Sequence, residues 1–343
     1  MTPARSRAAA TIVGLTLSGV LALTAANPAR AHTTGGPSAS NYRTEVSGLQ
    51  PGTADVVASL GPDREQIEVG VTGNSTVIVL GYRDEPYLRI GRQGVFENRS
   101  SPAVALNRDR VPRGAAAKRS PLQPPRWVRI SSSSVARWHD HRAHWMGRRT
   151  PAAVRADPDH RHRIESWQIP LRINGTQAAI NGALVWIPPP SPWPWVAIAV
   201  GLAIAVGFAA RTRRARAAMG GALIAAAAAG ATHVWAGQPF SDASGGGAAF
   251  EVTPSLAAVA LALIALVWLV RRGVWSAAPL VVLAGLFVFV SGGIADLSTL
   301  SHANVPSRLE PSAARGLVAV ALGLGLGLGL SGAARLRAPQ PET

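Results

Sequence analysis

Five long apolar runs in the second half of this chain constrain its fold more than any other feature. They occupy approximately residues 194–210, 217–236, 254–270, 276–296 and 314–334. A helix needs roughly 20 residues to cross a hydrocarbon core about 30 Å thick, so each run is long enough, or nearly so, to span a bilayer. We therefore expect an all-α membrane domain of five transmembrane helices over residues 194–334, followed by a tail at 335–343.

Charge predicts the orientation of these helices. Arginines gather in every second connection and in the tail, at residues 211–216, 271–272 and 335–337, whereas the alternate loops are mostly acidic. Cytoplasmic loops of membrane proteins carry the excess of basic residues. We expect a multi-pass protein of the plasma membrane, whose helices contact the lipid bilayer. Its tail is expected in the cytoplasm and its N-terminal domain outside it.

The first thirty-one residues have the pattern of an export signal. A basic start is followed by an apolar run at 8–26 and an Ala-Arg-Ala cleavage site at 29–31. Cleavage there makes His32 the first residue of the exported protein, and an uncleaved first transmembrane helix is the alternative. The chain contains no cysteine, which excludes a lipid-modified cysteine anchor, a disulfide framework and a thiolate metal site.

Between the signal and the helices, residues 32–187 are rich in short β-type segments separated by turns. Hairpin signals occur at Gly73-Asn74, in the stretch 91–94 and at Asn174-Gly175. The pattern predicts an all-β extracytoplasmic domain, a β-sandwich of Ig-like type. The proline-rich stretch 188–193 predicts a stiff, extended linker between this domain and the membrane.

The net charge of +16 does not indicate a nucleic-acid site. Lys118 is the only lysine, and the arginines of the first domain are interspersed with acidic residues rather than clustered. The chain also lacks Gly-x-Ser-x-Gly, His-Glu-x-x-His and a phosphate-binding glycine loop. We expect neither a nucleic-acid partner nor an enzyme.

The densest group of metal-ligand residue types lies at 139–144. His139 and His141 share one face of an extended segment, because side chains alternate every residue, and a turn brings His144 back towards them. Imidazoles suit copper, and the amine and imidazole of an N-terminal His32 add two nitrogens in the tetragonal arrangement that Cu(II) favours. These residues, with Asp140, form our candidate copper site, and a purely structural polar cluster is the alternative.

A second polar group is expected at the outer membrane face. His233 lies near the end of the second apolar run, Asp296 at the end of the fourth, and His302 in the next loop. Ionisable groups at membrane depth are costly and usually face a bundle interior or a cavity. The three residues line a cavity if they meet, and otherwise lie in headgroup water.

The last apolar run alternates leucine with Gly323, Gly325, Gly327 and Gly329. Glycines four residues apart permit close approach of two helices in a membrane. This pattern permits either a homo-oligomer through the last helix or tight packing within the bundle.

Several short segments have a pattern in common with known proteins, at residues 39–44, 80–82, 85–88, 138–140, 144–147 and 186–189. Together they resemble a family of actinobacterial exported, membrane-anchored proteins, and the resemblance implies architecture rather than mechanism. The mature N-terminal histidine after an Ala-x-Ala site is also similar to the copper-resistance protein C family, β-sandwich carriers that bind Cu(II) through that histidine, an aspartate and a second histidine. Only His32 matches that motif, and the residues after it, at 33–36, depart from it.

The leading hypothesis is a membrane-anchored extracytoplasmic protein that binds copper and supports copper handling in the cell envelope. A non-enzymatic structural or interaction protein, whose β-domain binds an envelope protein partner, is the first alternative. A subunit of a membrane transporter is the second.

Overall fold

The structure, a computed structural model, describes residues 39–62, 64–108, 123–147, 149–237 and 246–338. The chain divides into two compact units. The β unit comprises Ala39–Pro189 with His302–Arg308, and the helical unit comprises the described parts of Pro190–Ser301 and Leu309–Thr343. A β-sheet domain followed by apolar helices is the organisation that the sequence predicts.

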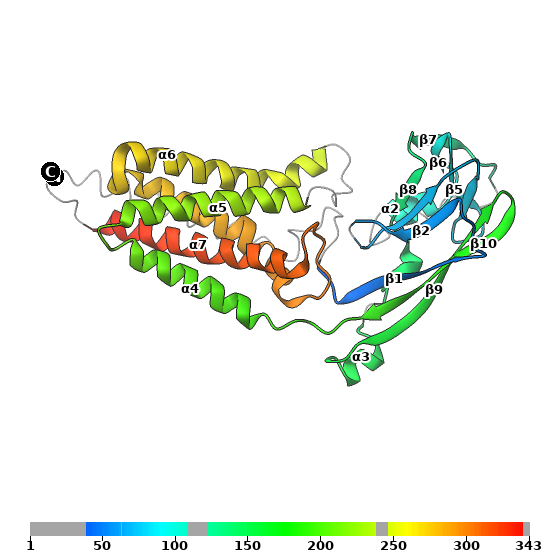
Figure 1. Ribbon diagram of the computed structural model, residues 1–343, viewed down its shortest axis with the longest axis horizontal. Helices are drawn as coiled ribbons and strands as arrows, with labels where there is room; N and C mark the ends of the chain where they lie inside the picture. Colours follow the sequence, from blue (N-terminus) through cyan, green and yellow to red (C-terminus); the bar gives the residue numbers. More distant parts are fainter. Residues whose placement is uncertain (1–38, 63, 109–122, 148, 238–245, 339–343) are drawn as a thin grey trace. The chain divides into compact units, whose positions relative to one another are not determined.

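Two antiparallel sheets form the β unit (Figure 1). The larger has the order β1-β10-β9-β4-β5-β6-β7 and the smaller the order β2-β3-β8. The strands are β1 Tyr42–Gln50, β2 Val56–Leu60, β3 Ile67–Val71, β4 Val77–Leu80, β5 Pro86–Gly91, β6 Gly94–Asn98, β7 Trp127–Ser131, β8 Val135–Trp138, β9 His162–Ile173 and β10 Thr176–Trp186. Short helices α2 Ala103–Arg108, η3 His141–Ala143 and α3 Ala152–Ala156 connect some of them.

Two of the three predicted hairpins are confirmed and one is wrong. β5 pairs with β6, and β9 pairs with β10 across Asn174 and Gly175, which both have positive φ, +50° and +88°. Positive φ at both central residues is what a two-residue hairpin turn of type I′ needs. The segments around Gly73 do not pair, because β3 lies in the small sheet and β4 in the large one.

One cluster of buried apolar side chains joins the two sheets. Ile67 and Val69 of β3 are fully buried, and so are Ile169 of β9 and Ile180 of β10. Burial of each such side chain contributes roughly 1.5–3 kcal/mol to folding. The alternation of buried and half-buried residues along β3 follows from this, because one face of the strand packs on the core.

The segment His302–Arg308 belongs to the β unit although it lies between two helices in the sequence. Ser40 and Asn304 exchange two backbone hydrogen bonds of 2.9 and 2.8 Å. The Ala303 amide donates to Oδ1 of Asn41 at 2.8 Å. Sequence reasoning gave no sign of this strand-like contact, because it joins residues more than 260 positions apart.

Within the described residues, the helical unit has three helices that are long and apolar enough to cross a membrane, at Ala215–Gly237, Thr253–Ile294 and Pro311–Arg337, instead of the expected five. Its elements are α4 Trp193–Ala209, α5 Ala215–Gly237, α6 Gly246–Val288, the π-helix η5 Phe289–Ile294, the 3₁₀-helix η6 Leu297–Ser301 and α7 Pro311–Arg337. These helices fit a lipid bilayer.

Two differences explain why the structure has three helices of spanning length where the sequence predicted five. α4 has 17 residues, which is shorter than the roughly 20 that a perpendicular span needs. The third and fourth predicted runs form the two helical parts of α6, which meet at a kink at Gly273, where φ is 80° and ψ is 177°. Figure 1 shows α6 turning back on itself. The backbone leaves the helical conformation at Gly273, and glycine adopts such a positive φ without steric cost.

The alternating glycines of α7 pack inside the same helical unit. A Cβ at Gly323 would lie 2.5 Å from the Ala199 carbonyl oxygen of α4, and one at Gly325 would lie 2.6 Å from the Phe289 amide nitrogen. Positions two apart on a helix differ by about 200°, so alternate glycines face opposite sides. α7 therefore approaches one neighbour with Gly323 and Gly327 and another with Gly325.

Candidate functional site

The histidine-rich loop, residues 139–144, follows the end of β8 and is shaped by the short helix η3. Asp140 is the N-cap of that helix, and its side chain accepts the Arg142 amide at 3.1 Å. An aspartate at this position satisfies a helix N–H that otherwise lacks an intrahelical partner. The loop consequently has a defined conformation that holds its histidines in place.

Asp140 lies at the centre of a buried hydrogen-bond network rather than at the surface. Its side chain is 0 % exposed. Nε and Nη2 of Arg142 donate to its two oxygens at 2.8 Å each, and Nε1 of Trp138 donates to Oδ2 at 3.0 Å. Burial favours the neutral acid, but these donors outweigh it and hold the pKa of Asp140 below its ordinary value. Both oxygens are engaged, so metal coordination by Asp140 would break this network.

Tyr82 connects the network to the rest of the β unit. Its hydroxyl accepts the His141 amide at 2.9 Å, contacts Asn107 Oδ1, and lies 3.3 Å from Oδ1 of Asp140. The Arg142 guanidinium lies 4.7 Å from the centre of its ring. Burial and the negative charge of Asp140 raise the pKa of Tyr82. Sequence reasoning did not identify this role, which depends on contacts across 58 and 59 residues.

The three histidines of the loop lie next to one another. The rings of His139 and His144 are stacked, with centroids 4.0 Å apart and an angle of 16° between their planes. His141 meets His139 edge-on, at 5.3 Å and 77°. The Nε2 atoms of His139 and His144 are buried. The sequence predicted that a turn brings His144 back towards His139 and His141, and the structure has the three rings in contact.

The cluster does not form a completed metal site among the described residues, where no three His, Asp or Glu side chains are placed to hold an ion. Ligand nitrogens lie about 2 Å from their metal and must point at it. The stacked rings of His139 and His144 present their faces to each other, so one of them must rotate before both coordinate one ion. His32 lies outside the described residues.

A groove runs beside the cluster. It is lined by His141, Arg142, His144, Trp145, Met146, Gly147, Glu165, Ser166, Trp167 and Gln168. Met146 is 46 % exposed, which is unusual for a large apolar side chain, and burial raises the pKa of Glu165. Nε1 of Trp167 is buried and has no hydrogen-bond partner among the described residues. Buried donors are normally satisfied, so this groove has the features of a binding surface.

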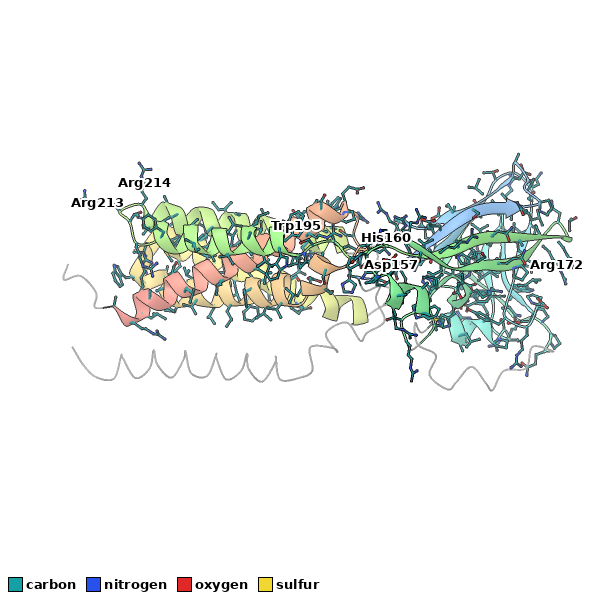
Figure 2. All side chains as sticks on the ribbon, turned by 90° about the horizontal axis from the view of Figure 1, so that it is seen from below. Asp157, His160, Arg172, Trp195, Arg213 and Arg214 are labelled. Carbon is teal, nitrogen blue, oxygen red and sulfur yellow. The ribbon has the colours of Figure 1, made fainter. Side chains whose placement is uncertain are left out.

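The other histidine pair of the β unit is a surface feature. Nδ1 of His160 lies 2.7 Å from Oδ1 of Asp157, and both side chains are exposed (Figure 2). The hydrogen bond to Asp157 raises the pKa of His160. His160 and the nearby His162 provide a comparison for the half-buried cluster of His139, His141 and His144, because neither of them lines the groove.

The structure brings together two of the three residues expected at the outer membrane face. Nε2 of His233, in α5, lies 3.1 Å from Oδ2 of Asp296, which follows Ala295, the C-cap residue of η5. His302 belongs to the β unit, so it is not part of this pair within the helical unit.

No family model, no curated protein and no solved structure matches this chain.

Proposed function

We propose that this protein is anchored in the plasma membrane by its apolar helices and presents its β unit outside the cytoplasm, where the histidine-rich loop binds copper. The anchoring rests on the three helices of spanning length. The orientation rests on charge: Arg213 and Arg214 extend from one end of the helical unit, in the connection between α4 and α5, and Trp195 lies towards the other end (Figure 2). Basic connections favour the cytoplasmic side.

The contact among three imidazoles is the observation that carries the copper proposal. Rings whose centroids are 4.0 and 5.3 Å apart need only side-chain rotation to direct several nitrogens to one ion. Imidazole and thioether ligands both suit copper, and Met146 lines the groove beside His141 and His144. The hydrogen bonds of Tyr82 and Asp140 fix the backbone of the loop, so that only side-chain rotation is needed to direct its imidazoles to one ion. His32, as a mature N-terminus, would add an amine and an imidazole.

A Cu(II) titration of the processed chain, which begins at His32, in detergent micelles and in competition with a chelator of known affinity, tests this function. We expect the wild type to bind one Cu(II) at least tenfold more tightly than a variant with His139→Ala, His141→Ala and His144→Ala. Circular dichroism establishes that the variant is folded. A separate form with one residue added before His32 tests whether the N-terminal amine contributes, and weaker binding is expected.

A matched control removes the exposed His160 and the half-buried His162 instead. The double variant His160→Ala and His162→Ala loses two imidazoles next to Asp157, and it should bind Cu(II) like the wild type. Equal affinity of the wild type and the triple variant would contradict the copper proposal, and so would equal losses in the triple variant and the control.

A second candidate function, binding of an envelope protein partner, is favoured by one observation. β7 is one of the two edge strands of the large sheet, and its Val128 and Ile130 are 40 % and 50 % exposed. Edge strands with exposed apolar side chains are templates for pairing with another chain. A photo-crosslinking residue at Ile130 should then give a discrete crosslinked product in cells, whereas one at the exposed Gln177 of β10 should not. The absence of a product specific to Ile130 would argue against this candidate.

A further inference from the structure

Three arginines that are far apart in the sequence share one face of the large sheet. Across β9, β4, β5, β6 and β7, the residues in register are Arg172, Ile78, Arg89, Phe96 and Arg129. Residues directly opposite each other on paired strands have their side chains on the same face. Arg129 and Arg172 are exposed and the other three are half-buried, so this face, which we call the arginine face, points away from the core.

Two aromatic rings hold the central arginine. Cζ of Arg89 lies 4.4 Å from the centre of the Phe96 ring and 5.1 Å from that of the Trp127 ring. A guanidinium that lies over an aromatic ring is attracted to it, and its N–H groups, which point outwards in its own plane, remain available to other partners. The rings therefore orient Arg89 without neutralising its charge.

No carboxylate neutralises the arginine face within the part of the chain that the structure describes. None of its three arginines forms an ion pair there. Arg129 only donates from Nε to the Ser131 carbonyl, at 3.3 Å. The one acidic residue in β4, β5, β6 and β7 is Glu97, which alternates to the opposite face and pairs with Arg99 at 3.0 Å. The face thus presents three positive charges that lack a counterion in the β unit.

The spacing of these charges favours a linear polymer as the ligand. Arg172 and Arg89 lie two strands apart, and so do Arg89 and Arg129, which places their Cα atoms about 10 Å apart at the ordinary strand spacing. Guanidinium groups bind carboxylates through paired hydrogen bonds. A polysaccharide with a carboxylate on every second sugar repeats its charge at a comparable interval, whereas polyphosphate carries a charge on every phosphorus.

The aromatic rings are less suited to nucleic acid. Proteins bind single-stranded nucleic acid by stacking its bases on open aromatic faces. Because Arg89 lies over both Phe96 and Trp127, these rings offer less surface for stacking. Recognition at this face therefore depends on the guanidinium groups.

We infer that the arginine face binds an acidic polysaccharide of the cell envelope through its carboxylates. Arg89, Arg129 and Arg172 are the binding residues, and Phe96 and Trp127 are positioning residues that orient Arg89. The choice of an envelope polymer rests on the extracytoplasmic location proposed above. The face shares no residue with the histidine-rich loop.

Binding of a fluorescently labelled hyaluronan oligosaccharide, which carries a carboxylate on every second sugar, tests the inference by fluorescence anisotropy with the full chain in uncharged detergent micelles. The triple variant Arg89→Gln, Arg129→Gln and Arg172→Gln should bind at least about tenfold more weakly, because a hydrogen bond to a charged group contributes about that factor or more. Added salt should weaken binding to the wild type, since exposed charges are screened. Circular dichroism establishes that the variants are folded.

A matched control removes the same charge elsewhere in the β unit. The exposed arginines Arg149, Arg155 and Arg163 lie outside the arginine face, and their triple substitution by Gln should leave hyaluronan binding unchanged. Trp127→Leu keeps every charge but removes one ring beside Arg89, so it should weaken binding, whereas Trp127→Phe, which keeps a ring, should retain it.

The inference is overturned if the wild type does not bind hyaluronan, if the Arg89, Arg129 and Arg172 variant binds it as tightly as the wild type, or if the control variant loses as much affinity. Arg129→Gln with Arg172→Gln, both exposed, gives the same test should the triple variant not fold. Carboxyl-reduced hyaluronan, polyphosphate or oligothymidylate that binds as tightly as hyaluronan also overturns it, and the last result would assign the face to nucleic acid. The assay contains no copper, so this inference and the copper proposal can fail independently.

Discussion

Substitution of single glycines in α7 tests the close packing of the helical unit. A Cβ at Gly325 would lie 2.6 Å from the Phe289 nitrogen and 2.8 Å from the Gly285 carbonyl oxygen. These are backbone atoms that cannot move aside by a change of rotamer. A Cβ at Gly329, one helical turn later, would meet nothing within 4 Å. Gly325→Ala and Gly329→Ala are therefore the same chemical change in the same helix. The added methyl group meets backbone atoms at Gly325 and open space at Gly329.

The matched pair isolates the cost of the clash. Alanine gains about 1 kcal/mol over glycine in a helix, and this gain applies to both variants. Overpacking a filled site costs typically about 1–3 kcal/mol. We therefore expect Gly325→Ala to be about 1–3 kcal/mol less stable than Gly329→Ala, because the gain in helix propensity cancels in the comparison.

Unfolding in mixed micelles of dodecylmaltoside and increasing SDS, followed by far-ultraviolet circular dichroism, measures this difference on the full chain. Gly329→Ala should unfold at the same or a higher SDS fraction than the wild type, and Gly325→Ala at a lower one than Gly329→Ala. Two variants of equal stability would refute the packing of α7 against η5 and α6, and with it the explanation of the alternating glycines.

Three further predictions concern the β unit and are measured by urea unfolding of the full chain in detergent. Tyr82→Phe removes a buried hydroxyl between several polar groups and should cost about 1–3 kcal/mol; a change below 0.5 kcal/mol, roughly the scatter of surface substitutions, would contradict the network. Asp140→Asn leaves the Arg142 guanidinium without its carboxylate and should cost about 3–5 kcal/mol at pH 7. Because the folded pKa of Asp140 is depressed, the wild type should lose this advantage over Asp140→Asn as the pH falls below the unfolded value of about 3.9 and through the folded pKa; an advantage independent of pH would refute that account. Gly182→Ala places a Cβ 2.1 Å from the Trp167 ring and should destabilise by about 1–3 kcal/mol, with a change in tryptophan fluorescence; unchanged stability and fluorescence would show that the indole does not lie on Gly182.

Local sequence signals predicted those parts of the fold that depend on neighbouring residues. The hairpin of β9 and β10 is specified by Asn174 and Gly175, because a two-residue turn fixes the register of the strands on either side. The segments on either side of Gly73 carry a similar signal, yet they enter different sheets. A turn sequence predicts only that the chain bends locally. The sheet that each flanking segment joins depends on the distant strands with which it pairs.

The candidate site divides in the same way. The spacing of His139, His141 and His144 indicated that the three side chains gather, and they do. Its position between His139 and His141 also suggested Asp140 as a ligand, which stays a prediction; in the fold its carboxylate accepts hydrogen bonds from Arg142 and Trp138. The sequence does not distinguish an aspartate that faces solvent from one that faces the core. The hydrogen-bond partners of the carboxylate depend on whether the fold buries it.

By itself the sequence determined the presence of a turn-rich β unit and a set of apolar helices, because hydrophobic periodicity and run length act over short stretches of chain. Only the tertiary structure decided that β3 and β4 separate, that two apolar runs join into α6 across Gly273, and that His302–Arg308 packs with the β unit. It also decided that Asp296 meets His233. These features rest on contacts between residues far apart in the chain, whose free energy depends on the complete packing and cannot be read from either partner alone.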